Sequence, residues 1–218
     1  MRLQNKCFQV SCDGGAATGK TTGAKLIAKK FHLKFLSSGL LYRYVSYLIL
    51  KNNPKNKIKF ISLKFSKLNY SKLKRLNLHT PEISKNSSMY AKNPRIRNIL
   101  KKYQVRFSKK NKKCCIEGRD ISTKILPKSD IKFYFVCNLK IASERRYKDL
   151  KRKKINVNLK DVKKALRIRN FIDKNRQNSP LLKHRDSIEI DTGKLGKTAM
   201  LNKMSKHIEK VLNKKYGN

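Results

Sequence analysis

A glycine-rich loop near the start of the chain holds the residues whose spacing most clearly serves chemistry. Gly14, Gly19, Lys20 and Thr21 complete the pattern G-x-x-x-x-G-K-[ST] between the apolar run 8–12 and a helix-like stretch. Glycines let consecutive backbone N–H groups point at phosphate oxygens, and the following helix N-terminus favours negative charge. The loop therefore predicts a nucleoside triphosphate site formed by Gly14, Gly15, Ala16, Ala17, Thr18, Gly19, Lys20, Thr21 and Thr22.

Two side chains of this loop have predicted roles in phosphate chemistry. A lysine in the position of Lys20 reaches the terminal phosphates, and a hydroxyl in the position of Thr21 ligates Mg²⁺. We therefore predict ATP as a ligand and Mg²⁺ as the metal. The sequence lacks the guanine-reading Asn-Lys-x-Asp of GTPases and the glycine-rich signature of transporter ATPases. Small-molecule kinases remain.

Three further groups of polar residues are candidates for holding a second, anionic substrate. Arg43 follows a small-residue elbow at 37–39, where its guanidinium would clamp a phosphate. The charged stretch 117–120 follows an apolar strand-like run. Arg169, Asp173 and Arg176 fall at i, i+4 and i+7, which places them on one helix face. Taken singly, each group is more typical of a solvated surface than of a ligand site.

The elements that must position these residues alternate between strand and helix. Apolar, β-rich runs are separated by segments with apolar residues at three- and four-residue spacing. This order predicts an α/β fold, a doubly wound five-stranded parallel sheet flanked by helices, with ligands at the carboxyl ends of the strands. The expected strands are 7–12, 33–36, 114–116, 131–137 and 187–190, and the expected helices are 19–30, 39–50, 94–107, 141–150, 159–175 and 195–213.

Composition bounds the class of protein. The chain has 218 residues, which suits one compact domain, and its 39% hydrophobic residues include no run long enough for a membrane span. No signal peptide is apparent, so we expect a cytoplasmic protein. The five cysteines match no zinc or redox spacing, and we expect them to be core residues.

The charge is strongly positive, with 56 Lys and Arg against 13 Asp and Glu and a formal net charge of +43. Such an excess favours a nucleic-acid partner, and a nucleic-acid-binding P-loop ATPase is the alternative from another class. However, the basic residues are spread along the whole chain, which a lysine-rich composition explains equally well. We expect no specific nucleic-acid partner and no membrane partner.

Five stretches of the sequence together resemble the bacterial-type cytidylate kinases, within the P-loop nucleoside monophosphate kinase group. They occur in the order and spacing of that family and span 7–213, with 52–77 poorly matched. Kinases of this fold acting on UMP or dCMP stay open as nearer alternatives. The stretches are DGGAATGKTT, SSGLLYR, IEGRDISTKILPKSDIKFYFVCN, RNFIDKNRQNSPL and DSIEIDTG.

The resemblance implies transfer of the ATP γ-phosphoryl group to CMP or dCMP by a monomer, with these small nucleotides as its partners. It implies that Arg43, Arg119 and Arg176 clamp the acceptor phosphate. Arg169 and Asp173 would contact the ribose, and Ser38 would line the same pocket. The cytosine would be recognised by Ser88, Arg97 and Asp120, and Arg145 and Arg146 would approach the transferring group from a lid.

The resemblance also implies a division of the single kinase domain and exposes four departures. The expected segments are a core at 1–51, 94–149 and 159–218, an acceptor-binding insert at 52–93 and a basic lid at 150–158. Asn170 stands in place of Asp, Ala142 and His79 each stand in place of Arg, and Gly15 stands in place of Pro. None of these departures removes a residue assigned to the phosphate clamp.

Overall fold

Five parallel strands form one sheet in the computed structural model, which describes residues 6–217. Residues 1–5 and 218, at the ends of the expected core segments, lie outside the described residues. The strand order is β2-β3-β1-β4-β5, so β1 is central and its neighbours are β3 and β4. This confirms the predicted fold class. The strands are β1 (Phe8–Gly14), β2 (Lys34–Ser37), β3 (Lys113–Gly118), β4 (Ile131–Val136) and β5 (Ile188–Asp191).

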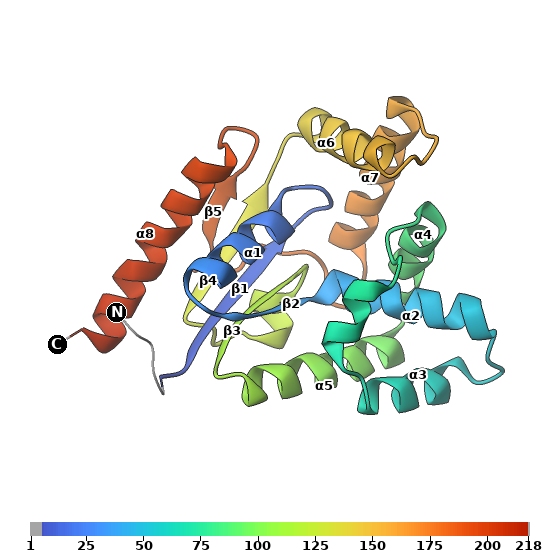
Figure 1. Cartoon of the computed structure of the whole chain (residues 1–218), viewed down its shortest axis with the longest axis horizontal. Helices are drawn as coiled ribbons and strands as arrows, with labels where there is room; N and C mark the ends of the chain where they lie inside the picture. The colour runs from blue at the N-terminus through green and yellow to red at the C-terminus, as the bar shows by residue number, and fades with distance from the viewer. Residues whose placement is uncertain (1–5, 218) are drawn as a thin grey trace.

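Helices cover both faces of the sheet (Figure 1). On one face, α1 (Lys20–Lys30) and α8 (Lys197–Tyr216) pack against side chains of β1 and β4. On the other face, α2 (Ser38–Asn52) and α5 (Pro94–Lys110) pack against β2 and β3. Alternate residues of β3 serve the two cores, because Cys115 belongs to the first and Cys114 and Ile116 belong to the second.

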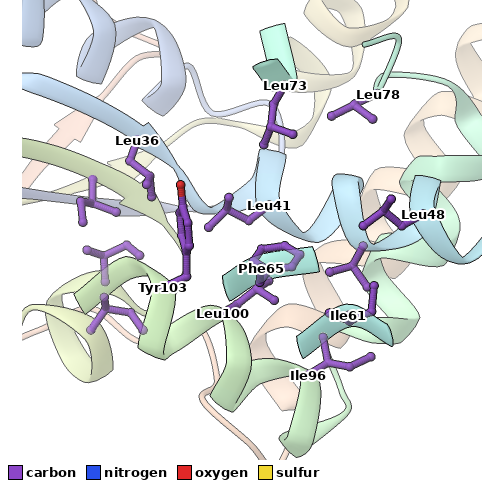
Figure 2. Close-up of a cluster of buried hydrophobic side chains, with 14 of the residues drawn as sticks. Leu36, Leu41, Leu48, Ile61, Phe65, Leu73, Leu78, Ile96, Leu100 and Tyr103 are labelled. Atoms are coloured by element: carbon purple, nitrogen blue, oxygen red, sulfur yellow. The ribbon is translucent and has the colours of Figure 1, made fainter. Parts of the chain in front are cut away.

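The segment between α2 and α5 contains helices that the sequence pattern did not predict. They are α3 (Lys57–Ser66), the 3-10 turn η1 (Tyr70–Arg75) and α4 (Pro81–Tyr90). Asn56 caps α3, and Thr80 caps α4 with a proline at its first position. Ile61, Phe65, Leu73 and Leu78 from this segment pack with Leu36 and Leu100 in one hydrophobic cluster (Figure 2). The insert is therefore joined to the second core.

Two more helices lie beyond the carboxyl ends of the strands (Figure 1). They are α6 (Leu139–Arg152) and α7 (Leu159–Asn175), and residues 153–158 connect them. A small apolar cluster of Ala16, Ala142, Leu150, Val162 and Leu166 ties the two helices to the loop after β1. Among residues 6–217, no helix is both long and apolar enough to cross a membrane.

The cysteine expectation needs one correction. Cys12, Cys114 and Cys115 are buried, and Cys137 is half-buried. Cys7, however, is exposed, because β1 begins at Phe8 and the residue before it has left the sheet.

Candidate active site

The loop between β1 and α1 has the backbone shape of an anion-binding nest. Gly14 and Gly19 have φ of 155° and 76°, values that side chains disfavour, and a Cβ at Gly14 would lie 2.5 Å from the carbonyl oxygen of Phe135. Ala17 also has a positive φ of 59°. Helix α1 begins at Lys20, and no side chain caps its N-terminus. Its first N–H groups are therefore free to donate to an anion.

Lys20 is buried, with a relative exposure of 6%. Its Nζ donates to the carbonyl oxygen of Gly15 at 3.2 Å and lies 3.7 Å from Oε2 of Glu117. Burial and the neighbouring Arg119 lower the pKa of Lys20 to about 7, although Glu117 opposes the shift. A bound polyphosphate would add negative charge beside this ammonium group and so favour its protonated form.

A cavity of about 710 Å³ opens beside Lys20 at the carboxyl ends of the strands. Its walls come from the phosphate loop, from α2, from the end of β3 and from α6 and α7. A cavity of this size accommodates ligands of nucleotide dimensions. Eight of the predicted site residues line it: Ala16, Ala17, Lys20, Thr21, Arg43, Arg119, Arg146 and Arg169.

A buried carboxylate organises the arginines beside this cavity. Asp173, 4% exposed, accepts from Nε of Arg119 at 2.8 Å, lies 3.5 Å from Nη1 of Arg176 and 4.0 Å from Nε of Arg169. Burial alone would raise the pKa of Asp173, but the three arginines together hold it below its ordinary value. One carboxylate thus gathers three of the predicted acceptor-binding cations.

The arginines have donors to spare. Nε of Arg169 and Nη2 of Arg176 are buried, and within residues 6–217 no atom accepts a hydrogen bond from them. Burial and nearby arginines lower the pKa of Arg169 and of Arg43, yet a guanidinium stays cationic near neutral pH. Buried donors without acceptors are costly, so their presence favours an anionic ligand at this position.

Arg43 and the predicted cytosine-contacting residues lie in distinct environments. Nη1 of Arg43 donates to the carbonyl oxygen of Leu78 at 3.0 Å and to Oγ of Ser84 at 2.6 Å, which joins α2 to the insert. Arg97 and Asp120 form a buried ion pair in a second cavity of about 190 Å³.

The two predicted serines lie in different parts of the site. Ser88 is on α4 and lines a different cavity between α4 and α7, which also contains Arg169. The structure therefore brings Arg97 and Asp120 together but does not bring Ser88 to them. Ser38 is buried at the start of α2, close to Gly118.

The two predicted lid arginines point to different places. Arg146 lines the main cavity. Arg145 instead donates to Oγ1 and the carbonyl oxygen of Thr192 at 3.0 and 2.7 Å, and the hydroxyl of Thr192 donates to the carbonyl oxygen of Thr18. In this conformation, Arg145 supports the phosphate loop through Thr192. The two arginines diverge because neighbouring residues on a helix point in different directions.

Sequence reasoning gave no role to the buried carboxylate of Asp13 and no individual role to that of Glu117. Glu117 lines the main cavity and accepts a hydrogen bond from Oγ of Ser37. Asp13 accepts from the backbone N–H groups of Ile121 and Ser122 at 2.8 and 2.7 Å and so fixes the turn after Asp120. Burial raises the pKa of Asp13 to about 6. Acidic residues at strand ends next to the glycines were the available signal.

Two of the sequence departures have a structural account. His79 lines the edge of the region facing Arg43, and burial with nearby cations lowers its pKa to about 4, so it is neutral where an arginine would be charged. Ala142 is 2% exposed and packs with Ala16 beneath the phosphate loop. A long cationic side chain at position 142 would have no room in that apolar cluster.

A parallel sheet with a phosphate loop after its central strand, facing a cavity rich in arginine, defines a P-loop kinase. Two solved structures share the fold over nearly the whole chain. One is an uncharacterized protein from Eubacterium ventriosum, with a TM-score of 0.56, 14% identity and coverage of 94% of this chain and 99% of that one. The other is TT1252 from Thermus thermophilus, with a TM-score of 0.53, 13% identity and coverage of 95% and 99%.

Sequence comparison identifies the family. The profile of the family described as cytidylate kinase matches residues 10–210. A cytidylate kinase from Clostridium tetani is 35% identical and covers 95% of this chain and 96% of its own length. One from Thermosipho melanesiensis is 34% identical, with coverage of 92% and 96%. The chain belongs to the cytidylate kinase family.

Proposed function

We propose that this chain transfers the γ-phosphoryl group of ATP to the phosphate of CMP or dCMP, giving ADP and CDP or dCDP. The observation that carries the proposal is the set of buried, unaccepted N–H donors on Arg169 and Arg176, gathered by Asp173 beside the cavity of Lys20. These donors fit the phosphate (Arg176) and the ribose (Arg169) of an acceptor nucleotide on the far side of the cavity from the phosphate loop. Membership of the cytidylate kinase family supports cytidine as its nucleoside.

On the donor side, the phosphates of ATP would lie in the loop 14–22. The free N–H groups at the start of α1 would hold the β-phosphate, and Lys20 would move from the carbonyl oxygen of Gly15 to the β- and γ-phosphates. A negative partner favours the protonated form of Lys20, whose pKa is lowered by burial.

On the acceptor side, Arg43, Arg119 and Arg176 would bind the CMP phosphate, and Arg169 and Asp173 would contact the ribose. Asp120 and Arg97 suit the cytosine ring, because a carboxylate accepts from its amino group and a guanidinium donates to its carbonyl. In the structure, these two side chains pair with each other. Ser38 and Ser88 complete the proposed acceptor site, and Ser88 would have to approach from α4.

The chemical step needs alignment and charge neutralisation more than proton transfer. An oxygen of the CMP phosphate is already anionic, so it attacks the γ-phosphorus without a general base. A new O–P bond forms, the bridging bond to the β-phosphate breaks, and the electron pair stays on ADP. Lys20, Arg119 and Arg146 would stabilise the negative charge on the oxygens of the phosphoryl group during its transfer.

The residues at the site fit Mg²⁺. The hydroxyl of Thr21 and the carboxylate of Glu117 both line the cavity, and these are the hard oxygen donors that Mg²⁺ prefers. Among residues 6–217, no group of three His, Cys, Asp or Glu side chains could hold a metal ion. When bound, Mg²⁺ would neutralise charge between the β- and γ-phosphates.

Water must be excluded, because it would otherwise accept the γ-phosphoryl group. The connection around 150–158 and the insert at 52–93 are the proposed closing segments, and Arg146 would be delivered by the first. Arg145 would have to leave Thr192 to reach the same phosphoryl group. A cytoplasmic location belongs to this proposal, and the free thiols of the chain suit a reducing compartment.

The test is ADP release, measured with a coupled assay against CMP, dCMP, UMP, AMP and GMP. The proposal predicts ADP release that depends on CMP or dCMP, with the other acceptors at least tenfold lower in kcat/KM. Equal or greater kcat/KM for AMP or GMP would contradict it. Release that is the same with and without any acceptor would instead indicate an ATPase.

A further inference from the structure

Two of the sequence departures, Gly15 and Asn170, lie against each other. A Cβ at Gly15 would lie 3.2 Å from Oδ1 of Asn170, which is tighter than ordinary packing, and 3.6 Å from its Cγ, which is a normal van der Waals contact. The two residues are 155 positions apart by their numbers, one in the phosphate loop and the other on α7. Glycine at position 15 therefore leaves the space that the carboxamide of Asn170 occupies.

The carboxamide holds one particular peptide unit of the phosphate loop. Oδ1 of Asn170 accepts from the N–H of Ala16 at 2.9 Å. The carbonyl oxygen of the same peptide unit, on Gly15, accepts from Nζ of Lys20 at 3.2 Å and from Oγ1 of Thr18 at 3.1 Å. The Gly15–Ala16 peptide is thus fixed at both ends, by Lys20 and Thr18 on one side and by Asn170 on the other.

ATP would remove one of these restraints. Lys20 leaves the Gly15 carbonyl when it turns to the phosphates, and a peptide unit next to glycine rotates easily. Asn170 is then the restraint from α7 that keeps the Ala16 N–H from turning away. Its helix is itself anchored, because Leu166 packs with Ala16 and Asp173 pairs with Arg119.

We propose that Asn170 is a positioning residue for the donor site, which holds the Gly15–Ala16 peptide in the orientation that accepts ATP. This inference rests on the proposed function, because ATP is the ligand concerned. Asn170 touches neither substrate in this account and acts through the loop. Its loss should therefore weaken binding of the donor and leave binding of the acceptor unchanged.

The experiment measures the affinity of the full chain for a non-hydrolysable ATP analogue with Mg²⁺ by calorimetry, without CMP. Asn170→Ala should weaken binding about fivefold, the effect of one hydrogen bond. Asn170→Asp, which still accepts from the Ala16 N–H, should stay within twofold of the original chain. Asn175→Ala is the matched control, because the Asn175 amide donates to the carbonyl oxygen of Phe171 in its own helix, and this variant should also stay within twofold.

A second variant tests the contact without removing it. Gly15→Ala places a methyl group against Asn170 and should weaken binding about threefold, with most of that loss absent when Asn170→Ala is also present. If the fold losses in affinity of the two single variants instead multiply in the double variant, the proposal is overturned. A loss of affinity below twofold in Asn170→Ala would also overturn it, and so would an equal loss in Asn170→Asp. A rise in KM for CMP in Asn170→Ala as large as the loss of affinity for the ATP analogue would overturn it too. If the unaltered chain binds the analogue but does not phosphorylate CMP, the proposed function fails and this inference stands.

Discussion

Asp173 is the residue on which the acceptor side of the site depends most, and Asp173→Asn is the sharpest perturbation of it. The change keeps the shape of the side chain but leaves Arg119, Arg169 and Arg176 without their shared buried counter-charge. Removing one partner of a buried ion pair costs about 3–5 kcal/mol. Asparagine still accepts from Nε of Arg119, so we expect the low end, about 3 kcal/mol.

For a chain of this length, such a loss lowers the melting temperature by roughly 6–12 °C. We also expect KM for CMP to rise about tenfold, ~1.4 kcal/mol, while KM for ATP stays within twofold. Because the folded pKa of Asp173 lies below its unfolded value, the ionised carboxylate stabilises the fold above the unfolded pKa. The stability difference between the two proteins should therefore be full above about pH 5 and shrink as the pH falls through the lowered folded pKa.

The assays are thermal unfolding from pH 3 to pH 8 and coupled ADP release with CMP varied. Asp186→Asn is the matched control, because that carboxylate is 61% exposed and its partners are exposed or lie outside the site. It should melt within 2 °C of the original chain, since exposed pairs contribute little. The reasoning is refuted if the melting temperature of Asp173→Asn equals that of the control variant and its KM for CMP is unchanged.

Three other predictions concern the donor side. Lys20→Ala should abolish CMP-dependent ADP release while the protein stays folded by circular dichroism, and full activity would count decisively against the site. Because the pKa of Lys20 is lowered to about 7, ATP binding at pH 7.0 should take up on the order of half a proton, measured by calorimetry in buffers of different ionisation enthalpy. Lys20→Met should lose this uptake, and equal uptake in both proteins would exclude Lys20 as its source. Arg146→Ala should lower kcat about 100-fold with KM for ATP little changed. Arg145→Ala should mainly lower the melting temperature and raise KM for ATP, because Arg145 braces the loop through Thr192. Equal kcat losses in both variants would show that Arg145 also reaches the phosphoryl group.

The alternating strands and helices could be predicted from sequence because each has a strong period and a fixed place in the chain. The predicted strand 7–12 is β1 from Phe8 to Gly14, and it runs on because Asp13 and Gly14 pair with Tyr134 and Phe135 of β4. That pairing is long-range and leaves no local signal. Helix α7 has the predicted bounds, 159–175, because Asn158 caps it.

The insert could not be predicted in the same way. Its helix α3 is only ten residues long, and its buried residues Ile61 and Phe65 face α2 and α5 rather than the sheet. The lysine and asparagine residues around them weaken the three- and four-residue spacing of apolar residues that predicts a helix. The caps Asn56 and Thr80 were the usable signals, and each is a single residue.

The site was predictable where one local motif defines it, and less so where distant elements meet. The phosphate loop follows from its own spacing, and Asp173 is gathered with Arg169 and Arg176 by one helix and the turn that follows it. The contact of Asn170 with Ala16 depends on how α7 packs across the loop, which no local pattern encodes. The direction of Arg145 depends likewise on Thr192, which directly follows the edge strand β5.

The central claim is that two nucleotides lie end to end, with the donor on the phosphate loop and the acceptor on the arginines. A crystal structure of the chain with ADP and CDP tests this most directly. The account predicts the β-phosphate of ADP within hydrogen-bond distance of the N–H groups of Gly19, Lys20 and Thr21. It also predicts a phosphate of CDP on Arg43, Arg119 and Arg176. Arginines that face solvent while both nucleotides bind elsewhere would contradict it.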